Sequence, residues 1–479
     1  MPEKRVAAKP AVKEPVAEQK DGLRRELGVW SAASIVVGTV IGSGIFLVPK
    51  TMVLNVGTPA MVLFVWVFGG VLSLCGALTY AELASAMPEA GGEYVFLREA
   101  YGPLMAYLYG WMQLWVGKAG SIATLATGFF LYLANFNPAL EKVWAVIPLP
   151  LGEHGRPLEI HYGQFMAMGV IVVLSAINYL GAKLGAGVQI GVTVVKVTLI
   201  VAIIIAGLMG GQGTAANFHT MTPAAGGIAG FFAALVAALW AYDGWNNVSM
   251  VSSEITNPQR NIPRALVLGT FAVVTIYVLI NCAYFFVLPA STVATTDRVA
   301  SEMIRHILGN WGAGAVSIAA MISIFAALNG SILSGSRVPY AMAIDGQFFR
   351  SIGRVHPRWR TPGASIILLG GWSAILVLSG KYDQLFTYVI FASAIFYALA
   401  ASSVIVLRFK RPDLARPYRV PGFPYLPIAF IVALVSLIVS TLVKSPRESI
   451  LGLGIIASGL PLYAYWKRVA RREKTSRDT

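Results

Sequence analysis

Histidine and acidic residues are scarce in this chain of 479 residues. It contains five histidines, which we place in loops or at the edges of apolar segments, and 22 Asp and Glu residues against 37 Lys and Arg residues. This placement excludes a histidine proton relay through the apolar segments. The carboxylates inside those segments are too few for an obvious sodium or divalent-metal cage. We therefore expect neither a metal nor a cofactor.

The chain also lacks the sequence patterns of an ATP-driven or catalytic protein. It has no Gly-x-x-x-x-Gly-Lys-Ser/Thr phosphate loop and no soluble segment large enough to hydrolyse ATP. No catalytic triad, metal cluster or acid/base pair lies in the apolar segments, so we do not expect an enzyme. The two cysteines, Cys75 and Cys282, lie within apolar segments and imply no disulfide framework.

Long apolar runs dominate the sequence instead. Hydrophobic residues make up 56% of the chain and charged residues 12%, and the mean hydropathy is +0.68. These values are typical of a protein that crosses the lipid bilayer many times, so we predict an all-α polytopic membrane protein. Its twelve transmembrane helices are expected at 29–54, 59–83, 103–134, 162–182, 186–209, 228–253, 265–288, 311–336, 362–380, 385–407, 424–443 and 450–466.

The distribution of basic residues predicts the orientation. With the N-terminus in the cytoplasm, 27 of the 37 Lys and Arg residues lie on the cytoplasmic side and 7 lie outside, as the positive-inside rule requires. The net charge of +15 then reflects topology and indicates no nucleic-acid partner. Residues 1–22 lack periodicity and are expected to form a disordered cytoplasmic tail. Residues 467–479 are expected to form a basic cytoplasmic tail.

The first predicted helix is interrupted near its centre. Gly38, Gly42 and Gly44 disfavour a continuous helix there. Unpaired backbone groups at membrane depth are tolerated only where they are buried in protein or line a cavity. The N–H groups of Ser43, Gly44 and Ile45 would form the positive end of a new half-helix, which favours binding of a substrate carboxylate.

The residues before this break offer the opposite charge. The upstream half-helix would end in free carbonyl groups of Thr39, Val40 and Ile41, which suit a cation such as an α-ammonium group. One break would thus offer both a positive and a negative pole to a ligand. The alternative interpretation is that the small residues only permit close packing of helices.

The sixth predicted helix is interrupted at 239–247. It supplies further carbonyl groups from Trp240, Ala241 and Asp243, and aromatic rings from Trp240, Tyr242 and Trp245. These rings are candidates for a gate over a bound ligand, although aromatic clusters in membrane proteins also serve packing or interface anchoring. Similar interruptions in the first and sixth helices indicate an inverted-repeat transporter.

Three roles are open for Asp243. It is the only acidic residue that we place at mid-membrane depth, where such a group is a functional candidate by default. Its carboxylate could contact a cationic substrate side chain, carry a proton, or cap backbone N–H groups at the break.

A lysine lies deep in the fifth predicted helix. Lys196 needs a partner at that depth, and free carbonyl groups at the first break would provide one. The ammonium would then tie the fifth helix to the first, as a bound cation could. Alternatively, Lys196 extends to the membrane surface. Lys118 in the third helix is similarly deep, but the sequence indicates no partner for it.

Short motifs along the chain carry a family resemblance. They are 39–46 (TVIGSGIF), 80–83 (YAEL) with Pro88, Gly91, Gly92 and Glu93, 242–246 (YDGWN) with Glu254, Asn257, Pro258, Arg260, Asn261 and Pro263, and 336–346 (SRVPYAMAIDG). Their combination resembles the amino acid/polyamine/organocation (APC) superfamily, and within it the L-type amino acid transporter (LAT) group. The resemblance extends over about residues 23 to 466.

The resemblance implies a fold and an activity. It implies a LeuT-type five-plus-five inverted repeat, with repeats at 23–209 and 210–410 and two further helices at 411–466. It also implies sodium-independent exchange of L-amino acids by alternating access. The implied substrate contacts are the N–H groups around Ser43 and Gly44 for the carboxylate and the carbonyl groups of Val40, Trp240, Ala241 and Asp243 for the amino group.

Supporting roles are implied as well. Trp240 would close the outer path, Asn246 would support the second break, and Lys196 would take the place of a sodium ion. Residues 135–161 contain no cysteine, whereas animal LAT light chains use one there to bind a heavy subunit. We therefore expect a monomer or weak homodimer without a disulfide-linked partner, in a bacterial cytoplasmic membrane. A proton-coupled symporter and a membrane amino acid sensor are the alternative functions.

Overall fold

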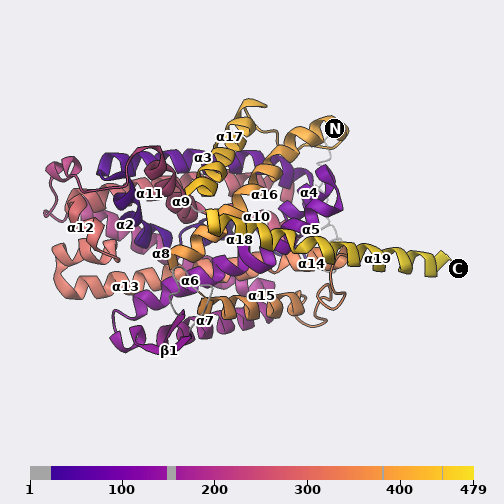
Figure 1. Cartoon of the computed structure of the whole chain (residues 1–479), viewed down its shortest axis with the longest axis horizontal. Coiled ribbons are helices and arrows are strands. Elements are labelled where there is room, and N and C mark those ends of the chain that lie inside the picture. The colour runs from indigo at the N-terminus through magenta and orange to yellow at the C-terminus, as the bar shows by residue number, and fades with distance from the viewer. Residues whose placement is uncertain (1–22, 148–157, 380–381, 445, 479) are drawn as a thin grey trace, which may run out of the picture.

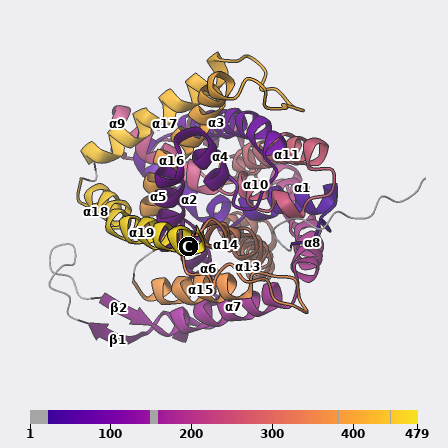
Figure 2. The same ribbon diagram turned by 90° about the vertical axis from the view of Figure 1, so that its right-hand side faces the viewer.

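The structure is a computed structural model that describes residues 23–147, 158–379, 382–444 and 446–478. Most of its helices run side by side along the longest axis of the molecule (Figure 1), and the view along that axis shows them packed around one another (Figure 2). Ten helical stretches of the described residues are long and apolar enough to cross a membrane. Two further apolar helices, Gly227–Tyr242 and Gly363–Ser379, are shorter. The chain is therefore a multi-pass membrane protein.

The helices follow the predicted order, with additional short segments between them. The first are α1 (Val29–Val40), α2 (Gly44–Val56), α3 (Pro59–Ala86), α4 (Glu93–Tyr101), α5 (Pro103–Met112), α6 (Lys118–Leu133), α7 (Tyr162–Tyr179) and α8 (Ala182–Met209). The others are α9 (Gly227–Tyr242), α10 (Asn247–Met250), α11 (Pro258–Val287), α12 (Ala290–Thr295), α13 (Val299–Gly335), α14 (Arg337–Ile344), α15 (Gly363–Leu376), α16 (Tyr382–Lys410), α17 (Tyr425–Lys444), α18 (Pro446–Ala457) and α19 (Gly459–Asp478).

Both predicted interruptions are confirmed. The first membrane helix ends as α1 at Val40 and resumes as α2 at Gly44. The sixth predicted membrane helix ends as α9 at Tyr242 and resumes as the short α10. Gly244 in the second break has φ of 109°, a conformation that residues with a side chain rarely adopt. The glycine is thus needed for the break itself.

Several helix boundaries differ from the prediction. α11 and α13 begin well before 265 and 311, because their first two turns carry charged residues, such as Arg260 and Arg305, that hydropathy excludes from a membrane helix. α13 also changes direction at Gly309, where φ is 69°. A π-helical segment, Gln113–Gly117, joins α5 to α6 within the third predicted helix. At the other end of the chain, α19 continues to Asp478 and includes most of the predicted basic tail.

The prediction of an all-α chain is incomplete at the loop before α7. Strands β1 (Val143–Ile147) and β2 (Leu158–His161) form an antiparallel pair there, at the periphery of the bundle in Figure 2. All five residues of Val143–Ile147 are apolar and most are exposed, so the sequence shows no alternation of apolar and polar residues that would predict a strand. The predicted N-terminal tail, 1–22, lies outside the described residues.

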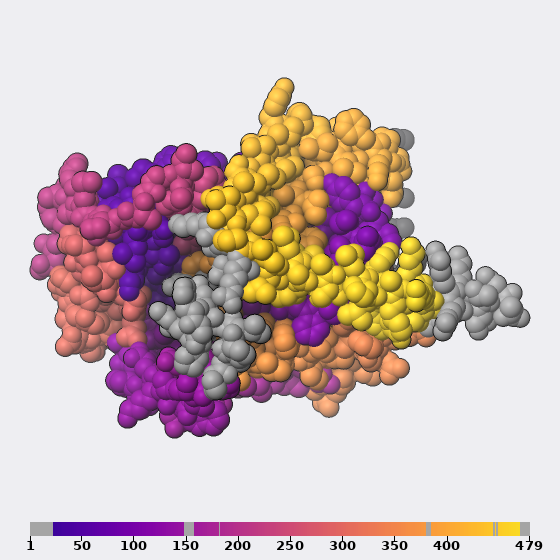
Figure 3. All heavy atoms as spheres, in the orientation of Figure 1, coloured from indigo at the N-terminus to yellow at the C-terminus, as the bar shows by residue number. Residues whose placement is uncertain are grey.

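The two interrupted helices lie against each other in the interior. The Thr39 hydroxyl donor lies 2.9 Å from the carbonyl oxygen of Gly244, so the two breaks touch directly. The C-terminal helices α17, α18 and α19 cross the face visible in Figure 3, and α19 projects beyond the bundle at the end where α4 and α14 lie (Figure 1). The interior breaks, rather than this outer layer, position the candidate site.

Candidate functional site

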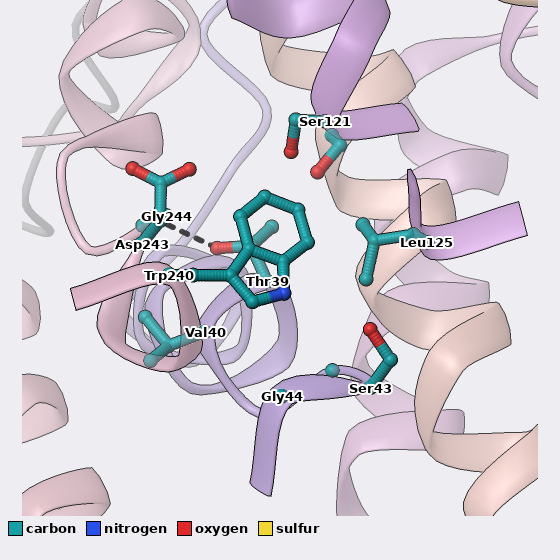
Figure 4. Close-up of a pocket in the computed structure, with 11 residues that line it drawn as sticks. Thr39, Val40, Ser43, Gly44, Ser121, Leu125, Trp240, Asp243 and Gly244 are labelled. Atoms are coloured by element: carbon teal, nitrogen blue, oxygen red, sulfur yellow. Dashed lines mark hydrogen bonds between the residues drawn. The ribbon is translucent and has the colours of Figure 1, made fainter. Parts of the chain in front are cut away.

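A narrow, partly open cavity lies where the two breaks meet. Figure 4 shows the Trp240 indole in the middle of this cavity, with Asp243 and Ser43 on opposite sides of it. Five of the predicted substrate-binding residues line it: Val40, Ser43, Gly44, Trp240 and Asp243. The breaks therefore form one shared site, because each contributes both backbone and side-chain atoms to the same cavity.

Three of the other six lining residues, those outside the breaks, carried no signal in the sequence. Thr39, Gly42 and Gly244 belong to the breaks, but Ser121 and Leu125 come from α6 and Ser331 from α13. A serine or leucine on an apolar helix fits packing equally well, so only the rotation of α6 and α13 shows which residues face the cavity.

The remaining predicted binding residues lie beside the cavity without lining it. The Ile41 carbonyl accepts hydrogen bonds from Lys196 and from the Ser323 hydroxyl, at 2.6 and 3.0 Å. Both lone pairs of that oxygen are therefore used. Ala241 packs against the start of α2, and the Tyr284 hydroxyl lies 3.5 Å from the carbonyl oxygen of Ile45.

The start of α2 is pressed closely against α9. A β-carbon added at Gly44 would lie 2.6 Å from both the Cα and the Cβ atoms of Ala241. The first N–H groups of a helix have no partner within that helix, and Gly44 is the first residue of α2. The absence of a side chain thus keeps this helix terminus accessible from the cavity and allows the two half-helices to touch.

Lys196 has the partners that the sequence predicts. Its ammonium group donates hydrogen bonds of 2.6 Å to the carbonyl oxygens of Gly38 and Ile41, and the residue is fully buried. A lysine that extended to the membrane surface would not bind there, so that alternative is excluded. Gln189 and Thr193 precede it on the same face of α8, and both contact the Ser34 carbonyl oxygen of α1.

A tyrosine of α11 joins the two breaks. The hydroxyl oxygen of Tyr277 lies 2.9 Å from the carbonyl oxygens of both Val40 and Ala241. Both carbonyl groups were expected to bind a substrate ammonium, and a carbonyl oxygen can accept two hydrogen bonds. The Val40 oxygen also accepts a hydrogen bond of 2.8 Å from the Gly42 N–H group, so it already has two donors. The Ala241 oxygen is therefore the less occupied of the two.

Asp243 borders the cavity with its carboxylate. Oδ1 accepts a hydrogen bond of 2.6 Å from the Tyr397 hydroxyl of α16. Its own N–H group donates to Trp240, but no backbone N–H group of the break donates to the carboxylate within the described part of the chain. The geometry thus disfavours the capping role and leaves the contact with a substrate cation and the proton-carrying role open.

The aromatic residues of the second break separate into two groups. The Trp240 indole stacks on Phe386 of α16, with ring centroids 6.0 Å apart. Tyr242 points away from the cavity, and its hydroxyl donates to the Trp66 carbonyl of α3 at 3.0 Å. Trp240 is therefore placed to cover a ligand, whereas Tyr242 anchors α9 to α3.

Asn246 and Asn247 connect the second break to α4 and α6. The Asn246 amide donates to the Glu93 carboxylate of α4, and the Lys118 ammonium donates to the Asn247 amide oxygen. Glu93 also accepts from the Tyr109 hydroxyl at 3.0 Å. These contacts give Asn246 the supporting position expected for it and give Lys118 the partner that the sequence did not indicate. Within the described residues, no cluster of three or more His, Cys, Asp or Glu side chains is present that could hold a metal ion.

Comparison with known proteins identifies relatives along the whole chain. The family model for amino acid permeases matches residues 27–460. The serine/threonine exchanger SteT of Bacillus subtilis is 33% identical over 458 residues, which cover 94% of this chain and 98% of the exchanger. The human b(0,+)-type amino acid transporter 1 is 33% identical over 447 residues, covering 92% and 88%.

A third relative is named for other substrates than the first two, cystine and glutamate. The human cystine/glutamate transporter is 32% identical over 454 residues, covering 94% of this chain and 87% of the transporter. All three relatives are transporters or exchangers of amino acids by name and are not enzymes. With its multi-pass helices and its family match, the chain belongs to the amino acid permease family of the APC superfamily.

Proposed function

We propose that this protein is a secondary transporter that exchanges L-amino acids across the membrane without sodium, by alternating access. Neutral amino acids are the main substrates and cationic ones a second group. The proposal includes a twelve-helix LeuT-type fold with two inverted repeats, a bacterial cytoplasmic membrane, and cytoplasmic termini. It also includes function without a disulfide-linked heavy subunit. The resemblance of the relatives, which are named as amino acid exchangers and transporters, supports this class of activity.

The cavity supports one binding mode. The substrate carboxylate binds the N–H groups of Ser43 and Gly44 at the positive end of α2. The substrate ammonium binds carbonyl oxygens at the end of α9, chiefly that of Trp240, which lines the cavity, with the adjoining Ala241 as a further acceptor. Trp240 covers the ligand, and the side chain extends toward Asp243, Ser121 and Ser331.

Lys196 is the observation that carries the sodium-independent part of the proposal. A buried ammonium on the carbonyl oxygens of Gly38 and Ile41 supplies a cationic hydrogen-bond donor at the first break. Because the charge is part of the protein, no dissolved cation is required to neutralise those carbonyl groups. Substrate binding is then coupled to the movement of the break without a coupling ion.

Counterflow in proteoliposomes tests this function. Vesicles containing the purified protein and loaded with an unlabelled amino acid should take up labelled amino acid rapidly, and empty vesicles should not. Replacing sodium with choline should leave the rate unchanged. Accumulation that depends on sodium, or uptake into empty vesicles equal to that into loaded ones, would contradict the proposal. A competition panel of the twenty amino acids would then define the substrates.

Asp243 favours one alternative, proton-coupled symport. A carboxylate that lines the cavity and has a hydroxyl as its hydrogen-bond partner is a suitable proton carrier. In that case a pH gradient alone should drive accumulation into empty vesicles, and an uncoupler should abolish it. Exchange predicts no such accumulation.

A further inference from the structure

A buried lysine lies one helical turn from the cavity and is not part of its lining. Lys118, Ser121 and Leu125 are spaced i, i+3 and i+7 along α6, which places them on one face of that helix. Ser121 and Leu125 line the cavity. Lys118 is 3% exposed, and its aliphatic stem lies beside Gly335 of α13, where an added β-carbon would be 3.0 Å from Cγ. Its position is therefore defined by packing as well as by charge.

The ammonium of Lys118 reaches the second break. It donates a hydrogen bond to the amide oxygen of Asn247, the first residue of α10 and the fourth residue after Asp243. The N–H group of Asn247 in turn donates to Gly244, 3.1 Å away, so the contact meets the break where the chain turns. Because Asn247 is only four residues from Asp243 in the break, this contact brings the Lys118 ammonium into the neighbourhood of the Asp243 carboxylate.

The cavity carboxylate lacks a direct ion pair. Within the described residues, the only hydrogen bond to the Asp243 side chain comes from Tyr397, which is uncharged, and Asp243 forms no ion pair with a basic side chain. Glu93 likewise accepts hydrogen bonds from neutral donors, the Asn246 amide and the Tyr109 hydroxyl. Asp243 is half-buried and has no cation in direct contact, so a positive charge that reaches the same break through Asn247 has a strong influence on what Asp243 attracts.

We propose that Lys118 is a specificity-determining residue that acts on the substrate through Asp243. Its fixed positive charge offsets part of the negative potential that Asp243 creates in the cavity. This offset reduces the attraction for cationic side chains and maintains the acceptance of neutral ones. The proposal rests on the proposed function, because it assumes that the cavity holds the amino acid side chain.

A double-mutant cycle tests this assignment. The variants are Lys118→Gln, Lys118→Arg, Asp243→Asn and the double variant Lys118→Gln/Asp243→Asn. In each, arginine and alanine compete with labelled alanine in proteoliposomes, and the ratio of their half-inhibitory concentrations is the readout. Lys118→Gln should shift this ratio about fivefold or more toward arginine, the scale on which a unit charge acts across several ångströms of protein interior. Lys118→Arg should retain the wild-type ratio.

The Asp243→Asn background distinguishes an electrostatic effect of Lys118 on Asp243 from a structural effect of Lys118 on the break. If Lys118 acts through Asp243, adding Lys118→Gln to Asp243→Asn should leave the ratio unchanged. An equal loss for both amino acids in Lys118→Gln, or the same shift in both backgrounds, would overturn the proposal. Ligand-induced shifts in the melting temperature of purified variants give the same ratio when transport is lost. A wild-type protein that transports neither amino acid would contradict the proposed function itself, which is a different outcome.

Discussion

The ammonium group of Lys196 donates a hydrogen bond of 2.6 Å to the carbonyl oxygen of Ile41, the residue directly after the end of α1. A second bond of the same length reaches Gly38, one turn earlier. The fifth predicted helix thus carries a fixed cation that binds the end of the first half-helix. This contact joins a whole helix to the break, so that a change in the position of α1 requires α8 to move with it or the bonds to part.

Removing this cation should stop transport without preventing assembly. We expect Lys196→Ala to lose most uptake while still reaching the membrane, because the Gly38 and Ile41 carbonyl oxygens lose their shared donor. Lys183→Ala, at an exposed position near the start of the same helix, is the matched control. Radiolabelled uptake normalised to surface protein measures the effect. Normal uptake by Lys196→Ala would refute the role assigned to this lysine.

The start of α2 should tolerate a change of side chain at Ser43 but not at Gly44. A β-carbon at Gly44 would lie 2.6 Å from Ala241, so Gly44→Val should abolish uptake. Ser43→Ala should be mild, because its hydroxyl forms no cap to the helix and the proposed ligand is the backbone N–H group. Gly191→Val is the control, since an added β-carbon there meets nothing within 4 Å.

Competition experiments test the same site from the ligand side. Amino acid amides and decarboxylated amines should compete poorly, because they lack the carboxylate that we propose to bind at the α2 terminus. Full activity of a well-expressed Gly44→Val carrier, or strong inhibition by amides, would place the carboxylate elsewhere.

Much of this arrangement could be predicted because the relevant residues are anomalies in their surroundings. Glycines in the middle of an apolar helix, a carboxylate at membrane depth and a lone lysine each violate a local rule, so Gly44, Asp243 and Lys196 stand out in the sequence. The partner of Lys196 was predictable as well, since a break is the natural source of free carbonyl groups.

Other parts of the site could not be predicted because their sequence is ordinary. Ser121 and Ser331 are small residues that suit any helix interface, and their contact with the cavity depends on helix rotation. Tyr277 fits an apolar helix as a packing residue, yet its hydroxyl bridges both breaks. The Lys118 contact with Asn247 depends on the relative position of α6 and α10, which one sequence does not determine.

The hydroxyl of Tyr277, which contacts both breaks, should be important for transport. Tyr277→Phe removes the hydroxyl shared by the Val40 and Ala241 carbonyl oxygens. Loss of a buried hydrogen bond costs about 1–3 kcal/mol, so uptake should fall about tenfold. Tyr284→Phe is the control, because that hydroxyl lies 3.5 Å from its nearest acceptor, Ile45. Equal uptake by the two variants would show that the bridge is dispensable.

A buried ion pair next to the second break should control stability. Arg337 of α14 donates to both carboxylate oxygens of Glu254, at 2.7 and 3.0 Å, and the two side chains are 0% and 2% exposed. Arg337→Met would leave a buried carboxylate unpaired, which costs about 3–5 kcal/mol. The melting temperature of the detergent-solubilised protein should fall clearly.

A surface pair offers the comparison for that measurement. Lys50 and Asp297 are 2.6 Å apart, but the Asp297 side chain is 82% exposed. Exposed pairs contribute little, about 0–1 kcal/mol, so Lys50→Met should change the melting temperature only slightly. Similar shifts for both variants would mean that the Glu254 carboxylate finds another partner in the folded protein.

Asp243 should distinguish substrates by the charge of their side chains. Its carboxylate borders the cavity beside Trp240 and is anchored by Tyr397 rather than by the backbone of the break. A cationic side chain that reaches it gains an opposite charge in a low-dielectric site, whereas a neutral side chain gains little. We therefore expect Asp243→Asn to reduce arginine and lysine transport much more than alanine and leucine transport. Asp297→Asn, on an exposed side chain, is the matched control. Equal loss for both classes would assign Asp243 to the structure of the break, and unchanged transport of both would remove it from the substrate site.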